Sequence, residues 1–191
     1  MAKMFNKPIK MLILTLMSII VVSVSAATYY NLIMEPRVAT SAPTIELVAG
    51  DDSATAGATG YAIDGTWARF TSLKAYPNAT LTYEEAINLS NTDASNAHSV
   101  RFRHKSITNL NGSATPTNFT RIAFILIAQN GTTVISSFNY TGGASWSTPS
   151  TTSYVSIPAN EEWAIRVETL AVSGSMANVM VEIDMYIDVQ E

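Results

Sequence analysis

The sequence predicts an all-β protein, an antiparallel β-sandwich or barrel formed by a single domain. After residue 43, short runs of alternating apolar and polar residues are separated by Gly, Asn, Pro, Ser and Thr, and no long helical period occurs. This pattern is typical of sandwiches, because successive side chains of a strand point to opposite faces of its sheet. The 191 residues, 47% of them hydrophobic, suffice for one packed core.

The final strand shows the alternation most clearly. From Val179 to Val189 every second residue is apolar, so this face is predicted to lie in the core. The opposite face is predicted to be solvated and carries Glu182, Asp184, Tyr186, Asp188 and Gln190.

The clearest hairpin is centred on Asn130-Gly131, a pair that suits the positive φ angles of a type I′ turn. Residues 122–128 precede it and are almost wholly apolar, which places them near the middle of the sandwich, buried on both faces. With these segments, about nine strands are predicted, enough for two sheets. The others are Thr44–Val48, Trp67–Leu73, Leu81–Leu89, Val100–Ile107, Tyr154–Ile157 and Trp163–Val172. DDSATAGATG and YTGGASWSTPSTTS are predicted to be surface loops.

Residues 1–26 have the features of a secretory signal peptide. Lys3, Lys7 and Lys10 precede an apolar stretch from residue 11 to 24, which ends in small residues. We expect cleavage after Ala26, with Ala27 as the alternative. The stretch is short for a bilayer span of roughly 20 residues, so removal is favoured over retention as a helix. The predicted mature protein is therefore extracellular and has no membrane segment.

Charge and cysteine content exclude several classes of partner and site. The chain has a net charge of −4, and removing the three leader lysines leaves eight basic against 15 acidic residues, a net charge of −7. This balance disfavours nucleic acid and anionic membranes as partners. There is no cysteine, so disulfides, thiolate-bound metals and cysteine nucleophiles are excluded.

No catalytic motif occurs, and we predict a protein that is not an enzyme and has no cofactor. His98 and His104 share one strand face but would lie some 20 Å apart at roughly 3.3 Å per residue, too far for one metal ion. The acidic stripe of the last strand could bind calcium only with a neighbouring loop such as residues 51–52; solvation, or pairing with the basic stripe Arg101, Arg103 and Lys105, is the simpler interpretation. No metal site is predicted.

Six sequons give candidate N-glycosylation sites, each expected to mark surface if occupied. For Asn130 there is an alternative interpretation, in which it serves only as a turn residue. The candidates are Asn78, Asn88, Asn111, Asn118, Asn130 and Asn139.

The segment that follows the cleavage site is unusually apolar for a free N-terminus. Residues 27–34 read as a strand, and residues 35–43 form a tether bounded by Pro36 and Pro43. The strand could be the first strand of its own domain. Alternatively, the stiff tether carries it into a groove of a neighbouring subunit, as in donor-strand complementation. The donor residues would be Ala27, Thr28, Tyr29, Tyr30, Asn31, Leu32, Ile33 and Met34.

The chain also resembles a known family over nearly its whole mature length. The runs AATYYNLIMEPRVATSAPTIELVAG, YPNATLTYEEAINLSNTDASNAHSVRFRH and IPANEEWAIRVETL, with the closing ANVMVEIDMYIDV, are similar to the TasA/camelysin family, and especially to archaeal bundling pilins. The resemblance implies a jelly-roll-like sandwich, 44–191, completed by the donated N-terminal strand of another subunit. It further implies extracellular fibres that bundle laterally in a biofilm. Some members are described as metallopeptidases, but this chain lacks their two-histidine zinc motif.

These observations predict a secreted structural subunit of a cell-surface filament, a head-to-tail homopolymer that serves cell–cell adhesion or a biofilm matrix. Two alternatives remain open. One is a type IV-like pilin that retains residues 11–34 as a helical filament core. The other is a monomeric secreted sandwich that binds carbohydrate or metal, with Trp67, Trp146 or Trp163 stacking on sugar; however, Trp67 and Trp163 occupy positions predicted to face the core.

Overall fold

The computed structural model describes residues 44–61, 65–109, 116–175 and 179–190. These residues belong to one compact unit, Ala42–Glu191. The predicted signal peptide 1–26, donor strand 27–34 and tether 35–43 lie outside the described residues, as does Asn111.

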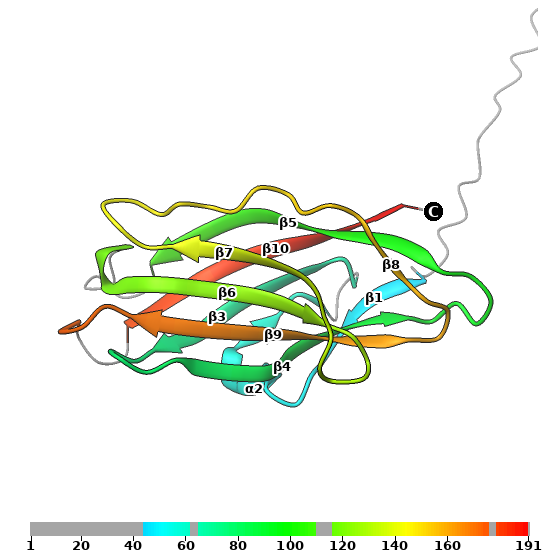
Figure 1. Cartoon of the computed structure of the whole chain (residues 1–191), viewed down its shortest axis with the longest axis horizontal. Coiled ribbons are helices and arrows are strands. Elements are labelled where there is room, and N and C mark those ends of the chain that lie inside the picture. The colour runs from blue at the N-terminus through cyan, green and yellow to red at the C-terminus, as the bar shows by residue number, and fades with distance from the viewer. Residues whose placement is uncertain (1–43, 62–64, 110–115, 176–178, 191) are drawn as a thin grey trace, which may run out of the picture. The chain divides into compact units, whose positions relative to one another are not determined.

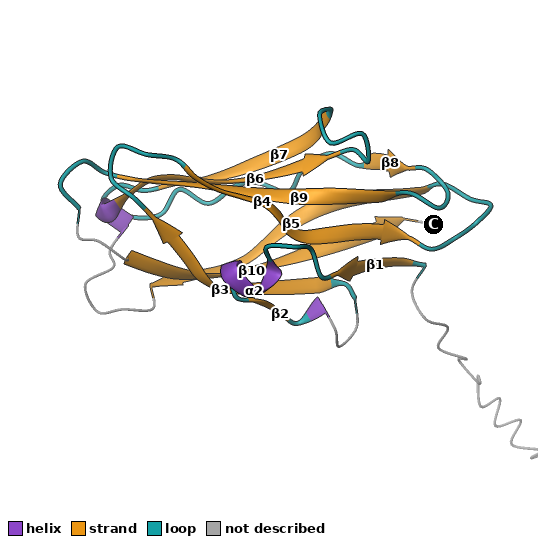
Figure 2. Cartoon of the chain, turned by 90° about the horizontal axis from the view of Figure 1, so that it is seen from below, coloured by secondary structure: helices purple, strands orange, loops and turns teal. Residues whose placement is uncertain are grey.

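The fold is an antiparallel β-sandwich of two five-stranded sheets, which confirms the predicted all-β class (Figures 1 and 2). Sheet A has the order β1-β4-β9-β6-β7, and sheet B has the order β2-β3-β10-β5-β8. The strands of sheet A are β1 (Ile45–Val48), β4 (Leu81–Asn91), β9 (Glu162–Ala171), β6 (Phe119–Ile127) and β7 (Val134–Thr141). Those of sheet B are β2 (Ala58–Thr59), β3 (Trp67–Ala75), β10 (Val179–Gln190), β5 (His98–Asn109) and β8 (Val155–Ile157).

The final strand, β10, lies at the centre of sheet B, between β3 and β5. Val181, Ile183 and Met185 are fully buried, as the alternation predicts. The other face differs from the prediction at Asp184, which is only 2% exposed. Its carboxylate is covered because Arg69 of β3 binds it with two hydrogen bonds, of 2.7 and 2.9 Å.

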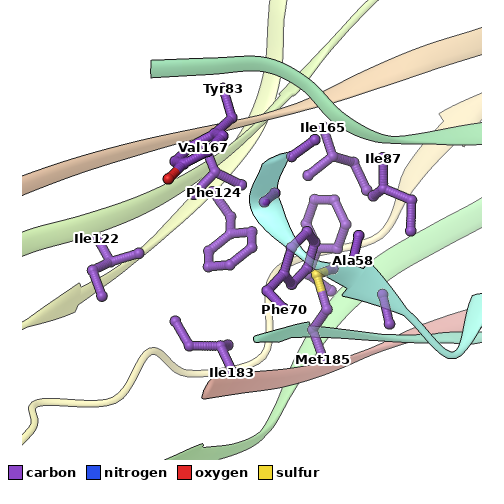
Figure 3. Close-up of a cluster of buried hydrophobic side chains, with 14 of the residues drawn as sticks. Ala58, Phe70, Tyr83, Ile87, Ile122, Phe124, Ile165, Val167, Ile183 and Met185 are labelled. Atoms are coloured by element: carbon purple, nitrogen blue, oxygen red, sulfur yellow. The ribbon is translucent and has the colours of Figure 1, made fainter. Parts of the chain in front are cut away.

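The core between the sheets is centred on aromatic rings (Figure 3). Phe124 of β6 contacts Phe70 of β3 edge-on across the sheets, with ring centroids 5.2 Å apart, and it stacks on Phe138 of β7 at 5.1 Å. The strand β6 is apolar on both faces as predicted, since Ala123 and Ile127 on its outer face are each 2% exposed. It lies one strand in from the edge of sheet A.

The hairpin between β6 and β7 exists, but its predicted turn type is wrong. Gly131 has a φ of 73°, whereas Asn130 is not among the residues with positive φ. The loop spans six residues, closed by a bond from Ala128 N to Thr133 O of 2.9 Å. Asn130 instead accepts hydrogen bonds from the N–H groups of Thr132 and Thr133 through its side chain, an Asx-type turn.

The stretch DDSATAGATG is not the surface loop that its composition predicts. It forms the short helix α2 (Ser53–Ala56) and β2, and Ser53, Ala56 and Ala58 are buried. Gly57 ends the helix with a φ of 65°, and a Cβ there would lie 2.6 Å from Ser72 Oγ. A low-complexity sequence is buried here because its small side chains let the segment approach β3 closely.

Candidate strand-accepting groove

The outer edge of β7 is open for pairing. β7 pairs with β6, and among the described residues its other edge makes backbone hydrogen bonds only at Thr141, which exchanges them with Ser147 at 3.1 and 2.9 Å. Since backbone groups alternate in direction along a strand, Ser137 and Asn139 point their N–H and C=O groups the same way as Thr141. An edge of this kind is a template for another strand.

The segment after β7 forms a wall opposite this edge. Figure 1 shows the chain returning alongside β7 toward β8. The segment is tied to β5 at Thr152, whose N–H donates to Phe102 O at 3.1 Å and whose Oγ1 accepts from Phe102 N at 3.0 Å. This wall belongs to the predicted loop YTGGASWSTPSTTS, although Tyr140, at its start, is a fully buried residue of β7.

Between β7 and the wall lies a groove of about 590 Å³, lined by residues 135–139 and 149–153 and by Val155. Most of the residues that line the groove are serine or threonine. Below the groove lies a tight apolar space with no room for a water molecule. It is bordered by Val100, Phe102 and Leu126, and also by three residues of the groove, Ser136, Thr152 and Val155. An extended chain in the groove would therefore meet a free backbone edge at one side and apolar core at its base.

The two sheets meet at this side of the sandwich through side chains of β5 and β7. The rings of Phe102 and Phe138 lie 5.3 Å apart, and His104 Nδ1 is hydrogen-bonded to the Tyr140 hydroxyl at 2.8 Å. Burial lowers the pKa of His104 and raises that of Tyr140. Both groups are therefore neutral at neutral pH. His104 lies in the middle of β5, whereas His98 is its first residue.

Acid should destabilise the sandwich in two steps. Because the pKa of folded His104 is depressed, the unfolded chain binds its proton more readily, and stability falls as pH drops below about 6.5. A second loss begins below about pH 3.9, because Arg69 lowers the pKa of Asp184 and the N–H of Ser95 lowers that of Asp93. Urea unfolding followed at several pH values measures both steps.

The variants that separate the two steps are His104→Gln and Asp184→Asn. H104Q should flatten the upper step and leave the lower one in place, whereas D184N should reduce the lower step. If H104Q loses as much stability as the wild type in the upper step, the assignment of that step to His104 is wrong.

The predicted acidic and basic stripes pair across strands on the outer face of sheet B. Asp188 of β10 binds both Arg101 at 3.1 Å and Arg103 at 3.0 Å. Among the described residues, no three His, Asp or Glu side chains converge into a metal site. The three carboxylates of the acidic stripe, Glu182, Asp184 and Asp188, are thus each paired with an arginine.

The tryptophans do not all lie where the alternation placed them. Trp163 is 3% exposed and in the core, as predicted. Trp67 was predicted to face inward, which is wrong, because its neighbour Ala68 takes the core position and Trp67 lies outside with Arg69 and Lys105 against its ring. Trp146 is partly buried against Phe119.

The sequons differ in how accessible their asparagines are. Asn78 and Asn139 are exposed, and Asn139 lies on β7 beside the groove. Asn88 is 8% exposed, and its amide donates to Glu162. Asn118 is partly buried, and Asn130 is exposed with its side chain bonded within the turn. The geometry therefore favours Asn78 and Asn139 as acceptors for a glycan.

The sequence pattern indicates a donor segment but does not locate its acceptor. The only signal for it was the stretch 140–153, rich in Ser and Thr and interrupted by Pro149, which cannot donate a ladder hydrogen bond. A segment of that kind after a regular strand leaves the strand without a partner on one side.

No protein-family description matches the chain, and no curated protein is significantly similar to it. In the part of the chain that is described, no helix has the length and apolar character needed to cross a bilayer.

Proposed function

We propose that this protein is a non-enzymatic, secreted subunit of an extracellular cell-surface filament. In this proposal each subunit donates residues 27–34 to the groove along β7 of the next, head to tail. Such a contact is heterologous and does not close, so it grows a fibre. The fibre would serve adhesion between cells or a biofilm matrix, with lateral bundling and N-glycans on its exposed surface.

The observation that carries this proposal is the edge of β7 beside a groove, which among the described residues is free up to Thr141. β7 has eight residues, as does the segment 27–34, and at about 3.3 Å per residue each spans roughly 26 Å. Tyr30, Leu32 and Met34 would share one face of the donated strand. Each large apolar side chain that becomes buried contributes about 1.5–3 kcal/mol, which offsets the cost of ordering the segment.

The first test is to sequence the N-terminus of the protein from the cell surface and to examine the same sample by negative-stain microscopy. A start at residues 26–28 together with fibres supports strand donation. A start upstream of residue 11 would favour the type IV-like pilin with a helical core. A cleaved chain without fibres would favour a monomeric binding module.

A matched pair of substitutions tests the donated face. Leu32→Asp should yield a secreted, folded protein that forms no fibres, because the charge would have to be buried in the groove. Asn31→Asp adds the same charge on the opposite face and should leave fibres intact. Fibres of normal length from L32D, or from a chain that lacks residues 27–34, would contradict the proposal.

A further inference from the structure

The outer face of sheet B carries a row of cations. Arg101, Arg103 and Lys105 alternate along β5 with buried Val100 and Phe102, so they project from the same face, over roughly 13 Å at 3.3 Å per residue. Arg69 of β3 lies on the other side of β10. These four residues are more than half of the seven lysines and arginines among the described residues.

The cations on this face lie above the carboxylates that bind them. The side chains of Asp184 and Asp188 are 3% and 21% exposed, whereas those of Arg103 and Lys105 are 45% and 41% exposed. Asp188 serves two arginines at once, Arg101 and Arg103. With Glu182, which lies 3.7 Å from Arg69, this face holds four cations against three carboxylates, so its net charge is positive although the chain as a whole is acidic.

Aromatic rings hold the cations in fixed positions. Arg101 lies 4.5 Å from the centroid of Tyr154, Arg103 lies 4.6 Å from that of Tyr186, and Lys105 lies between Tyr186 and Trp67, at 5.0 and 5.3 Å. Contacts of this kind contribute about 0.5–1 kcal/mol each at exposed sites. Because the cations lie against these rings, the face presents charges in fixed positions to a ligand, and the rings are not bare for stacking.

We propose that this face binds an acidic polysaccharide. A fixed row of guanidinium and ammonium groups is complementary to carboxylates spaced along a linear polymer. Nucleic acid fits less well, because duplex DNA carries about one charge per 1.7 Å, a density that three cations spread over roughly 13 Å do not match, and because single strands need open ring faces. This inference does not depend on strand donation.

The test measures binding of the secreted protein to immobilised polygalacturonate, with neutral dextran and duplex DNA as comparison surfaces. Polygalacturonate should be bound, and binding should weaken as salt is raised. The variant Arg103→Gln/Lys105→Gln should bind roughly tenfold more weakly, because two charged contacts are lost. The control Arg121→Gln/Arg166→Gln removes two cations of sheet A and should bind like the wild type.

Thermal melting of each variant establishes that it is folded. Lys105→Gln alone is the second variant, since Lys105 is exposed and its only ion pair within the described ranges is the 4.0 Å contact with Asp184; it should weaken binding by a smaller factor. Absence of binding to polygalacturonate, equal binding to dextran or DNA, or equal loss in the sheet A control would each overturn the proposal.

Discussion

A disulfide across the groove should abolish polymerisation, and its reduction should restore it. Ser136 of β7 and Thr152 of the opposite wall both line the groove, so Ser136→Cys/Thr152→Cys would tie the wall to the strand and exclude a donor. The chain contains no cysteine, so no other intramolecular bridge can form. Fibres counted by microscopy and sedimented protein should both fall to background in the oxidised sample and recover with reductant.

Two controls separate closure of the groove from damage to the fold. Ser136→Cys alone, given the same oxidant, should polymerise. Ser90→Cys/Glu162→Cys places a pair on facing positions of β4 and β9, away from the groove, and should polymerise whether oxidised or reduced. Mass spectrometry verifies each bridge. Wild-type polymerisation of the bridged 136–152 variant would contradict donation into this groove.

Local alternation predicted the strands of this protein well. In β10 and β9 the apolar residues recur at every second position, and Ile183, Ile165 and Val167 are buried where that period places them. The same rule failed at Trp67, because an alternating run fixes which residues share a face but leaves open which face is the core. Ala68 and Phe70 fill the inner positions of β3, and Trp67 packs outside beneath cations.

The local sequence pattern could not predict the groove, because the groove depends on which strand lies at the edge of a sheet. β6 and β7 are both alternating or apolar runs, yet β6 is paired on both sides and β7 on one. That difference arises from β9, more than 20 residues later in the chain, which pairs with β6. The ion pairs between β5 and β10 were open to prediction, since two stripes of opposite charge were visible, but the burial of Asp184 beneath Arg69 of β3 was not.

Replacing Phe124 by alanine should cost about 3–5 kcal/mol of the free energy of unfolding, the range for a large aromatic residue deleted from a core. Phe124 is fully buried, and its ring joins Phe70 of sheet B to Phe138 and Tyr140 of β7. Its loss would leave a cavity at the point where the two sheets meet. Urea unfolding measures the change.

A loss of this size is a large part of the 5–15 kcal/mol typical of a domain, so we expect a low yield of folded F124A. Phe124→Leu keeps most of the volume and should cost less than F124A, which keeps the test informative. Val134→Ala, at a residue that is 58% exposed on β7, is the matched control and should change stability by no more than about 0.5 kcal/mol. If F124A unfolds at the same urea concentration as V134A, the aromatic cluster does not join the sheets, and their stability must come mainly from the aliphatic residues of β4, β9 and β10.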